Sequence, residues 1–214
     1  MFDLLIKGGS VCDGSGAAAY TADIAVKDGQ IAAIGTFPEE TAQTVIHAAG
    51  KTVTPGFIDP HTHVDKTILL APELEPYLKQ GVTTVVTGNC GQSPAPLGDE
   101  VFYGSMQNFQ YLEQTGADLF EMVSFFQDKA RAKKAMKEIF SVDLDWDSFG
   151  SFWEKAGTLP LGGNIVPLAG YNAIRTAVMG KDCLRPARPD ELKQLELLTE
   201  RCMEQGAFGL STGR

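Results

Sequence analysis

Short apolar runs separated by turn residues characterise the first part of the chain. Residues 2–7 form one such run, which ends at Gly8-Gly9. Residues 22–26 and 30–34 flank Asp28-Gly29, and an Asp-Gly pair between two apolar runs is a strong signal for a β-hairpin. Two further β-rich runs follow at residues 44–47 and 52–53. The pattern predicts a small β-sandwich layer over residues 1–54.

From Pro55 onward, the hydrophobic pattern changes to an alternation of strands and helices. Residues 56–59 lead into a strand that is predicted to end at His61 and His63, and residues 82–87 form a continuous β-branched run. A run without polar alternation suits a strand buried on both faces, as in a parallel sheet. Further strands are predicted at residues 164–169 and 207–210, with helices in the intervening segments at 73–80, from Ala173, and at 189–205. This alternation predicts an α/β fold over residues 55–214.

The segment from about residue 98 to residue 160 is long for a single connection between two strands. Helices are predicted at residues 117–126 and 129–140, and an aromatic cluster follows at Trp146, Phe149, Phe152 and Trp153. The cluster is consistent with a lid over a site or with a helical excursion that packs on the outside of the sheet. Aromatic residues at such spacings usually serve packing, so we favour the second interpretation.

The net charge of the chain argues against nucleic acids and anionic membranes as partners. Lys plus Arg number 18 and Asp plus Glu number 27, which gives a net charge of −9. Nucleic-acid binding and docking on an anionic membrane both need clustered basic residues, so neither partner is expected. The opening segment MFDLLIKGG does not resemble a signal peptide, and the four cysteines are not closely paired. A cytoplasmic protein with free thiols is therefore expected.

The stretch PGFIDPHTHVD, from Pro55 to Asp65, carries the strongest chemical signal. On a strand, residues i and i+2 point to the same side, so His61 and His63 would present both imidazoles on one face and could share a divalent metal. Cys90 follows the next predicted strand in a glycine-flanked loop. Neighbouring parallel strands bring their C-terminal ends to the same rim, so the Cys90 thiolate can join the histidines. The alternative is a buried free cysteine that behaves as a small hydrophobic residue.

Three stretches of the chain together resemble the D-aminoacylase branch of the amidohydrolase superfamily, the N-acyl-D-amino-acid deacylases. These stretches are PGFIDPHTH, QGVTTVVTGNCGQSPAPL from Gln80, and AFGLSTG from Ala207. The resemblance covers essentially the whole chain as the N-terminal part of such an enzyme. Most relatives in the superfamily carry a carboxylated lysine after the fourth strand, where this chain has Ser211-Thr212-Gly213. In the D-aminoacylase branch a cysteine ligates the metal instead, and that role maps onto Cys90 beside His61 and His63.

The resemblance implies a (β/α)8 TIM barrel and zinc-dependent hydrolysis of the amide bond of N-acyl-D-amino acids, with one or two Zn²⁺ ions. The catalytic aspartate of the family would lie beyond Arg214, so no catalytic residue is expected in this chain. Asp65 is assigned an indirect role beside the metal ligands or a structural role. Tyr171, which replaces a histidine that is common in relatives, and Arg175 are weaker candidates for substrate binding. For Arg175, a structural or surface role is the favoured alternative.

Length separates this chain from a complete barrel. A closed (β/α)8 barrel takes ~250 residues, and residues 55–214 leave room for about four strand–helix units. We therefore expect that a missing C-terminal half or a second chain completes the barrel, and that this chain alone is inactive on a small-molecule substrate. Two alternatives remain open. One is another amidohydrolase, of the hydantoinase or dihydroorotase type, and the other is a non-catalytic truncated protein that binds a metal or a partner.

Overall fold

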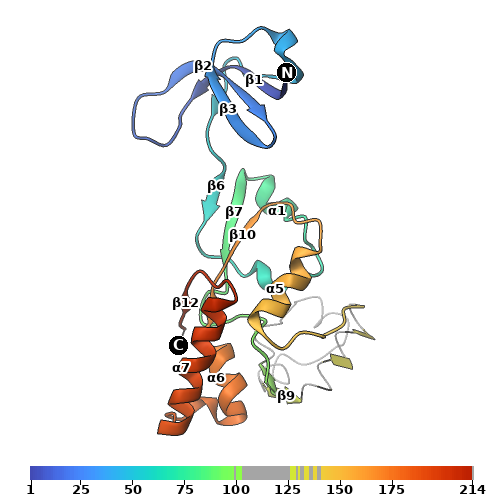
Figure 1. Cartoon of the computed structure of the whole chain (residues 1–214), viewed down its shortest axis with the longest axis vertical. Helices are drawn as coiled ribbons and strands as arrows, with labels where there is room; N and C mark the ends of the chain where they lie inside the picture. Colours follow the sequence, from blue (N-terminus) through green and yellow to red (C-terminus); the bar gives the residue numbers. More distant parts are fainter. Residues whose placement is uncertain are drawn as a thin grey trace. The chain divides into compact units, whose positions relative to one another are not determined.

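The computed structural model of the chain describes residues 1–98, 100–102, 126–128, 130, 133–134, 137–138 and 141–213. The chain divides into two compact units, Met1–Gly56 and Phe57–Arg214. Each unit has its own strands and its own buried residues, and each is described separately below (Figure 1). None of the described helices combines the length and the apolar character that a bilayer-spanning segment needs.

The first unit is a five-stranded sheet. Its strands run in the order β3–β2–β1–β4, with β5 also paired with β1. The strand bounds are Phe2–Val11 for β1, Tyr20–Lys27 for β2, Gln30–Gly35 for β3, Ala42–His47 for β4 and Thr52–Val53 for β5, and the 3₁₀ helix η1 spans Glu39–Thr41. Lys27 pairs with Gln30 across a two-residue turn in which Asp28 and Gly29 have φ values of 52° and 73°. Two consecutive positive φ angles suit a hairpin turn of type I′, so the predicted hairpin is confirmed.

The second unit contains parallel strands that follow one another in sequence order. The strands β6 (Phe57–Asp59), β7 (Val82–Thr87) and β10 (Asn164–Pro167) form a parallel sheet with β7 in the middle. After Leu168 the chain continues as β11 (Ala169–Gly170), which pairs in parallel with β12 (Leu210–Ser211). Parallel strands place their C-terminal ends on one side, so the loops after β6, β7 and β11 leave from the same edge. Within the described residues, β8 (Glu100–Phe102) and β9 (Phe126–Asp128) form a separate antiparallel pair.

Helices flank these strands (Figure 1). The α-helices are α1 (Glu75–Leu78), α5 (Phe149–Gly157), α6 (Tyr171–Met179) and α7 (Pro189–Glu204), and the 3₁₀ helices are η2 (Val64–Lys66) and η4 (Gly180–Leu184). Ser148 caps α5 by accepting a hydrogen bond from the Ser151 N–H at 3.2 Å. Pro189 opens α7, where its missing N–H costs nothing because the first helical N–H groups have no intrahelical partner. The predicted start of α7 at residue 189 is therefore confirmed.

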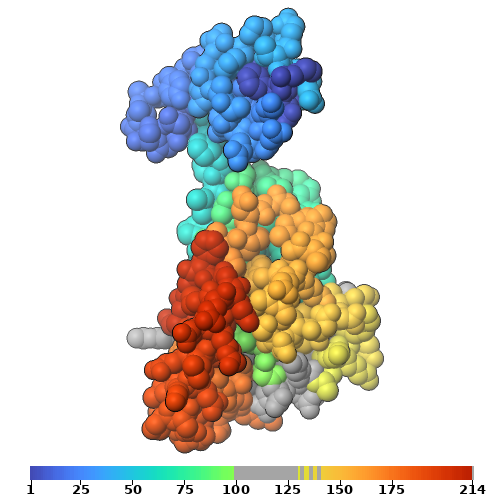
Figure 2. Space-filling view, in the orientation of Figure 1, coloured from blue at the N-terminus to red at the C-terminus, as the bar shows by residue number. Residues whose placement is uncertain are grey.

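The predicted aromatic cluster lies in the core of the second unit. Trp146, Phe149 and Phe152 are 3%, 1% and 1% exposed, and the indole Nε1 of Trp146 donates to the Pro94 carbonyl at 2.9 Å. Figure 2 shows α7 beside the chain of α5, and there the Gly150 N–H donates to Oε1 of Gln205 at 3.0 Å. Burial to this degree supports the packing interpretation over a lid.

Two predicted elements in the long connection fall largely outside the described residues. Of the helix expected at residues 117–126, only Phe126 is described, and it begins β9. Of the helix expected at 129–140, the described residues are helical, namely Ala130, Lys133, Lys134, Lys137 and Glu138. The strand expected at residues 207–210 is shorter and later than predicted, because only Leu210–Ser211 pair with a neighbouring strand.

Candidate metal centre

The two histidines follow β6, but neither lies on a strand. The strand ends at Asp59, whose Oδ1 accepts a hydrogen bond from the His61 N–H at 3.1 Å. A carboxylate that accepts from a backbone N–H two residues later forms a local turn, which competes with strand pairing. The prediction that the strand extends to His61 and His63 was therefore wrong, although the two side chains do face a common neighbour.

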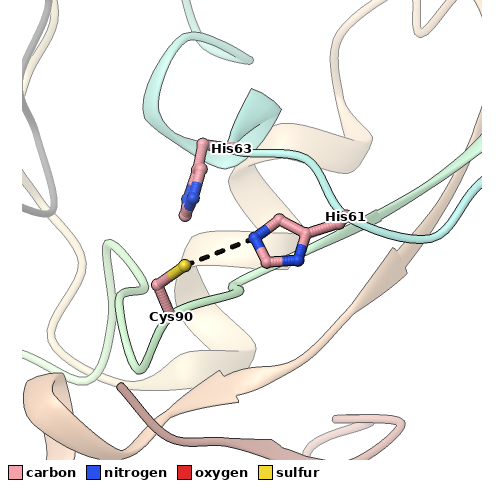
Figure 3. A group of neighbouring side chains, drawn as sticks. All are labelled: His61, His63 and Cys90. Atoms are coloured by element: carbon pink, nitrogen blue, oxygen red, sulfur yellow. Dashed lines mark hydrogen bonds between the residues drawn. The ribbon is translucent and has the colours of Figure 1, made fainter. Parts of the chain in front are cut away.

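Thr62, between the two histidines, anchors this segment to β7. Its backbone N–H and its Oγ1 both donate to the Val86 carbonyl, at 2.9 and 2.8 Å. Thr62 is buried, whereas His61 is exposed and His63 is half-buried. The anchored central residue leaves both imidazoles directed toward the Cys90 loop (Figure 3).

Cys90 lies in a tight loop after β7. Its φ of 56° is in the left-handed region, which non-glycine residues rarely adopt. A Cβ on Gly91 would come within 2.9 Å of the Gly213 nitrogen, and a Cβ on Gly213 within 2.2 Å of the Cys90 carbonyl oxygen. Glycine at these two positions thus allows the segment after β12 to pack directly against the backbone of Cys90.

Two polar side chains hold this loop in place. Ser211 of β12 is buried, and its Oγ accepts from the Gly91 N–H at 3.1 Å while donating to the Gly88 carbonyl. Ser211 therefore fixes the backbone on both sides of Cys90. Asn89 donates through Nδ2 to the Thr62 carbonyl at 3.2 Å, which ties the cysteine loop to the histidine segment.

The result is a cluster of three potential ligands. One ligand atom each from His61, His63 and Cys90 lies within 4.8 Å of the others. Nε2 of His61 is 3.3 Å from Sγ of Cys90, and the two imidazole rings are 5.7 Å apart between centroids with their planes at 74° (Figure 3). The structure thus brings together all three residues that the sequence singled out as metal ligands.

The chemistry of this cluster fits a zinc ion. Imidazole nitrogen and thiolate sulfur are the ligands that zinc prefers, and three protein ligands leave a coordination position for water or substrate. Among the described residues, the buried Nδ1 of His63 has no hydrogen-bond partner. Burial, followed by the charges of Lys66 and His61, lowers the pKa of His63, which keeps its ring neutral and able to ligate.

Asp65 lies in η2, two residues after His63, and is 2% exposed. Thr87 donates through Oγ1 to its Oδ1, and the Asp65 N–H donates back to Thr87 Oγ1 at 3.1 Å. Its Oδ2 has no partner among the described residues. Burial is the main cause that raises the pKa of Asp65 to about 6, against the bond from Thr87, which lowers it. This aspartate thus holds the segment that follows the histidines against β7, and it is not one of the three clustered ligands.

The two weaker substrate-binding candidates lie on α6, Tyr171 at its first position and Arg175 one turn later. Arg175 donates from Nε to the Cys183 carbonyl at 2.9 Å and from Nη2 to the Arg185 carbonyl at 2.7 Å. Its guanidinium also lies 5.8 Å from the ring centre of Tyr171. Two backbone carbonyls therefore accept from Nε and Nη2 of Arg175, which supports the structural alternative for this arginine.

Sequence reasoning missed three residues of this region: Lys66, Gln92 and Ser211. Lys66 donates to Gln92 at 2.6 Å across 26 positions of sequence, and Ser211 bonds to the Cys90 loop across more than a hundred. The only available signal was their position, since each is within three residues of a predicted ligand or of the end of a predicted strand.

Comparison with known proteins matches residues 44–117 to the amidohydrolase family model. The chain is 35% identical over 212 residues to D-aminoacylase of Alcaligenes xylosoxydans xylosoxydans, covering 99% of this chain and 38% of that enzyme. The chain therefore spans less than two fifths of the length of this relative.

Solved structures agree with the sequence match. The crystal structure of a D-aminoacylase superposes with a TM-score of 0.77 at 33% identity, covering 100% of this chain and 39% of that one. N-acyl-D-glutamate deacylase of Bordetella bronchiseptica, in complex with zinc and a phosphonate inhibitor, gives a TM-score of 0.74 at 29% identity, covering 99% of this chain and 38% of that one.

Proposed function

We propose that this chain forms part of a zinc-dependent hydrolase of N-acyl-D-amino acids. The premise is that the chain belongs to the D-aminoacylase branch of the amidohydrolase superfamily. The observation that carries the proposal is the convergence of His61, His63 and Cys90. A thiolate beside two imidazoles is a set of ligands for a borderline-soft metal and not for Mg²⁺ or Ca²⁺. That the deacylase of Bordetella bronchiseptica is in complex with zinc supports the choice of ion.

The residues of this chain would hold the metal and leave it accessible. A zinc ion bound there supplies Lewis-acid polarisation of an amide carbonyl and a water of lowered pKa. His61 and Cys90 are exposed, so a small substrate can approach the ligands from solvent. Hydrogen bonds of Thr62, Asn89 and Ser211 hold the histidine segment and the Cys90 loop in place, which limits movement of the ligands.

We further propose that the parallel strands of the second unit are the first part of a (β/α)8 barrel. Four successive strand segments run in parallel and in sequence order, as in such a barrel. The remaining histidine, His47, lies in β4 of the first unit. Because the chain spans 38% of the length of the Alcaligenes enzyme, further ligands and the proton-transferring carboxylate would come from the part of such an enzyme that this chain does not span, and the chain alone is expected to be inactive.

A chimera tests this proposal. The 212 matched residues of the Alcaligenes D-aminoacylase are replaced by this chain, and zinc content and hydrolysis of N-acetyl-D-methionine and N-acetyl-L-methionine are measured. We expect bound zinc and hydrolysis of the D-enantiomer only. The variant Cys90→Ser should lose both, whereas Cys12→Ser, at an exposed cysteine of the first unit, should retain both.

The possible failures are distinguishable. A folded chimera without zinc would contradict the metal centre. A zinc-loaded chimera that opens hydantoin or dihydroorotate rings and leaves both N-acetylmethionines intact would assign the chain to a different amidohydrolase activity.

A further inference from the structure

A half-buried lysine lies beside the candidate metal centre and links its two loops. Lys66 is three residues beyond His63, in η2, and its Nζ donates to Oε1 of Gln92 at 2.6 Å. Gln92 is two residues beyond Cys90. Burial lowers the pKa of Lys66, against the charges of Asp65 and Cys90, which act to raise it. After burial, the charge of Lys66 is the next cause that lowers the pKa of His63, so the ammonium lies close to the ligands.

This ammonium has no carboxylate partner within the described part of the chain. None of the ion pairs between described residues includes Lys66. The neighbouring carboxyl of Asp65 is directed to Thr87 instead. A lysine ammonium has three N–H donors, and Gln92 accepts from one of them. A half-buried cation with donors to spare is costly unless an anion binds it.

The position of Lys66 matches the chemistry of the proposed substrate, and the inference rests on that proposed function. In an N-acyl amino acid, only the amide nitrogen and Cα separate the scissile carbonyl from the carboxylate. A carbonyl at the metal centre therefore brings the carboxylate to the immediate surroundings of the ligands. A divalent ion and the Lys66 ammonium carry three positive charges, against two negative charges from a Cys90 thiolate and the Asp65 carboxylate, so the site is positive in a chain with a net charge of −9.

We propose that Lys66, oriented by Gln92, binds the carboxylate of the N-acyl amino acid and selects substrates that carry it. Gln92 fixes the ammonium by its 2.6 Å bond, and the two remaining N–H groups donate to the carboxylate oxygens. The alternative is that Lys66 only joins the two loops. The two roles differ in one respect, because only an anion subsite distinguishes a carboxylate from a neutral amide.

The experiment uses the 214-residue chain, both zinc-loaded and metal-free, and two probes that differ in that one group. N-acetyl-D-alanine and N-acetyl-D-alaninamide are titrated, and dissociation constants are taken from NMR chemical-shift changes. We expect the wild-type chain to bind the carboxylate roughly tenfold more tightly than the amide. Lys66→Met should abolish this preference and leave the amide affinity unchanged, and Lys66→Arg should retain it.

Lys79→Met is the matched control, since the Lys79 side chain is 71% exposed and pairs with Glu75 in α1. It should bind both probes as the wild type does. A carboxylate preference that is absent in the wild type, or unchanged in Lys66→Met, would overturn the subsite. Failure of the wild-type chain to bind zinc contradicts the metal centre instead, and the metal-free titrations still decide the role of Lys66.

Discussion

Two buried aspartates, one in each unit, have opposite environments. Asp23 of the first unit accepts hydrogen bonds from the Gly8 N–H at 2.8 Å, the Phe37 N–H at 2.9 Å and the Lys7 ammonium at 3.3 Å. The bond from Phe37 is the main cause that lowers its pKa. One oxygen of Asp65, which is 2% exposed in the second unit, has no partner among the described residues, and burial raises the pKa of this carboxyl to about 6.

This contrast separates a structural carboxylate from one at a functional site. Buried polar groups are nearly always hydrogen-bonded, and Asp23 follows that rule fully. In the described structure, the unpartnered buried side-chain atoms are Oδ2 of Asp65 and Nδ1 of His63, which belong to residues two positions apart, and His63 is one of the three candidate ligands. Polar groups left incomplete by the fold are expected where a ligand completes them. The second unit should therefore gain stability from zinc, and the first unit should not.

The largest expected effect is on zinc affinity. Replacement of Cys90 by serine removes the thiolate, and a ligand's share of the binding free energy of a zinc site is about 4 kcal/mol, or roughly 1,000-fold in affinity. Competition with a chromophoric chelator measures this change in the Cys90→Ser chain. Cys12→Ser is the control, and an equal loss of zinc affinity in that variant would contradict the assignment of the zinc site to the second unit.

Removal of the structural carboxylate should act on the first unit alone. Asp23→Ala leaves two backbone N–H groups and a lysine without their acceptor, which we expect to cost about 3 kcal/mol. Hydrogen exchange of the β1 amides should quicken in this variant, while zinc affinity stays at the wild-type value. A change in zinc affinity would show that the two units are coupled.

How far the sequence predicts these features depends on the range of the contacts involved. The bounds of β7 were predicted correctly because six consecutive strand-forming residues suffice to specify a buried strand. The Asp28-Gly29 hairpin was predicted for the same reason, since a turn depends on its own two residues. The histidine segment was mispredicted as strand because the bond between the Asp59 side chain and the His61 backbone overrides a simple i, i+2 pattern.

Contacts between loops could not be predicted from the pattern. The bonds from Lys66 to Gln92 and from Ser211 to the Cys90 loop form only once β6, β7 and β12 are side by side. The pairing of Cys90 with His61 and His63 was predicted from the strand order, although the 3.3 Å separation between Cys90 and His61 was not. The order of the parallel strands determines which loops are neighbours, and the packing of the loops determines which of their atoms are in contact.

The contrast between the two aspartates predicts that loss of the carboxylate charge destabilises the chain at Asp23 and stabilises it at Asp65. The pKa of Asp65 in the folded chain, about 6, lies above the usual value of 3.8 for an aspartate, so its charged form disfavours folding, and this cost appears as the pH rises from about 4 to above 6. In the metal-free chain at pH 8, Asp65→Asn should raise the free energy of unfolding by up to about 3 kcal/mol. Tryptophan fluorescence during urea unfolding measures this, since Trp146 and Trp153 both lie in the second unit. At pH 4 the difference should vanish, and destabilisation at both pH values would contradict the account.

The smallest expected effect comes from the support of the cysteine loop. Ser211→Ala removes the bonds to Gly88 and Gly91, so Cys90 is held less firmly and zinc affinity should fall about tenfold. The cobalt-substituted chain should show a weaker thiolate-to-metal absorption band, which a change remote from the ligands would not alter. Ser15→Ala, in an exposed turn of the first unit, is the control and should leave the band unchanged.

The central claim, that His61, His63 and Cys90 form a zinc centre, is tested most directly by X-ray absorption at the zinc edge on the zinc-loaded chain. The account predicts one sulfur at ~2.3 Å and two imidazole nitrogens at ~2.0 Å, with the sulfur lost in Cys90→Ser. A wild-type spectrum with only oxygen and nitrogen neighbours would contradict it.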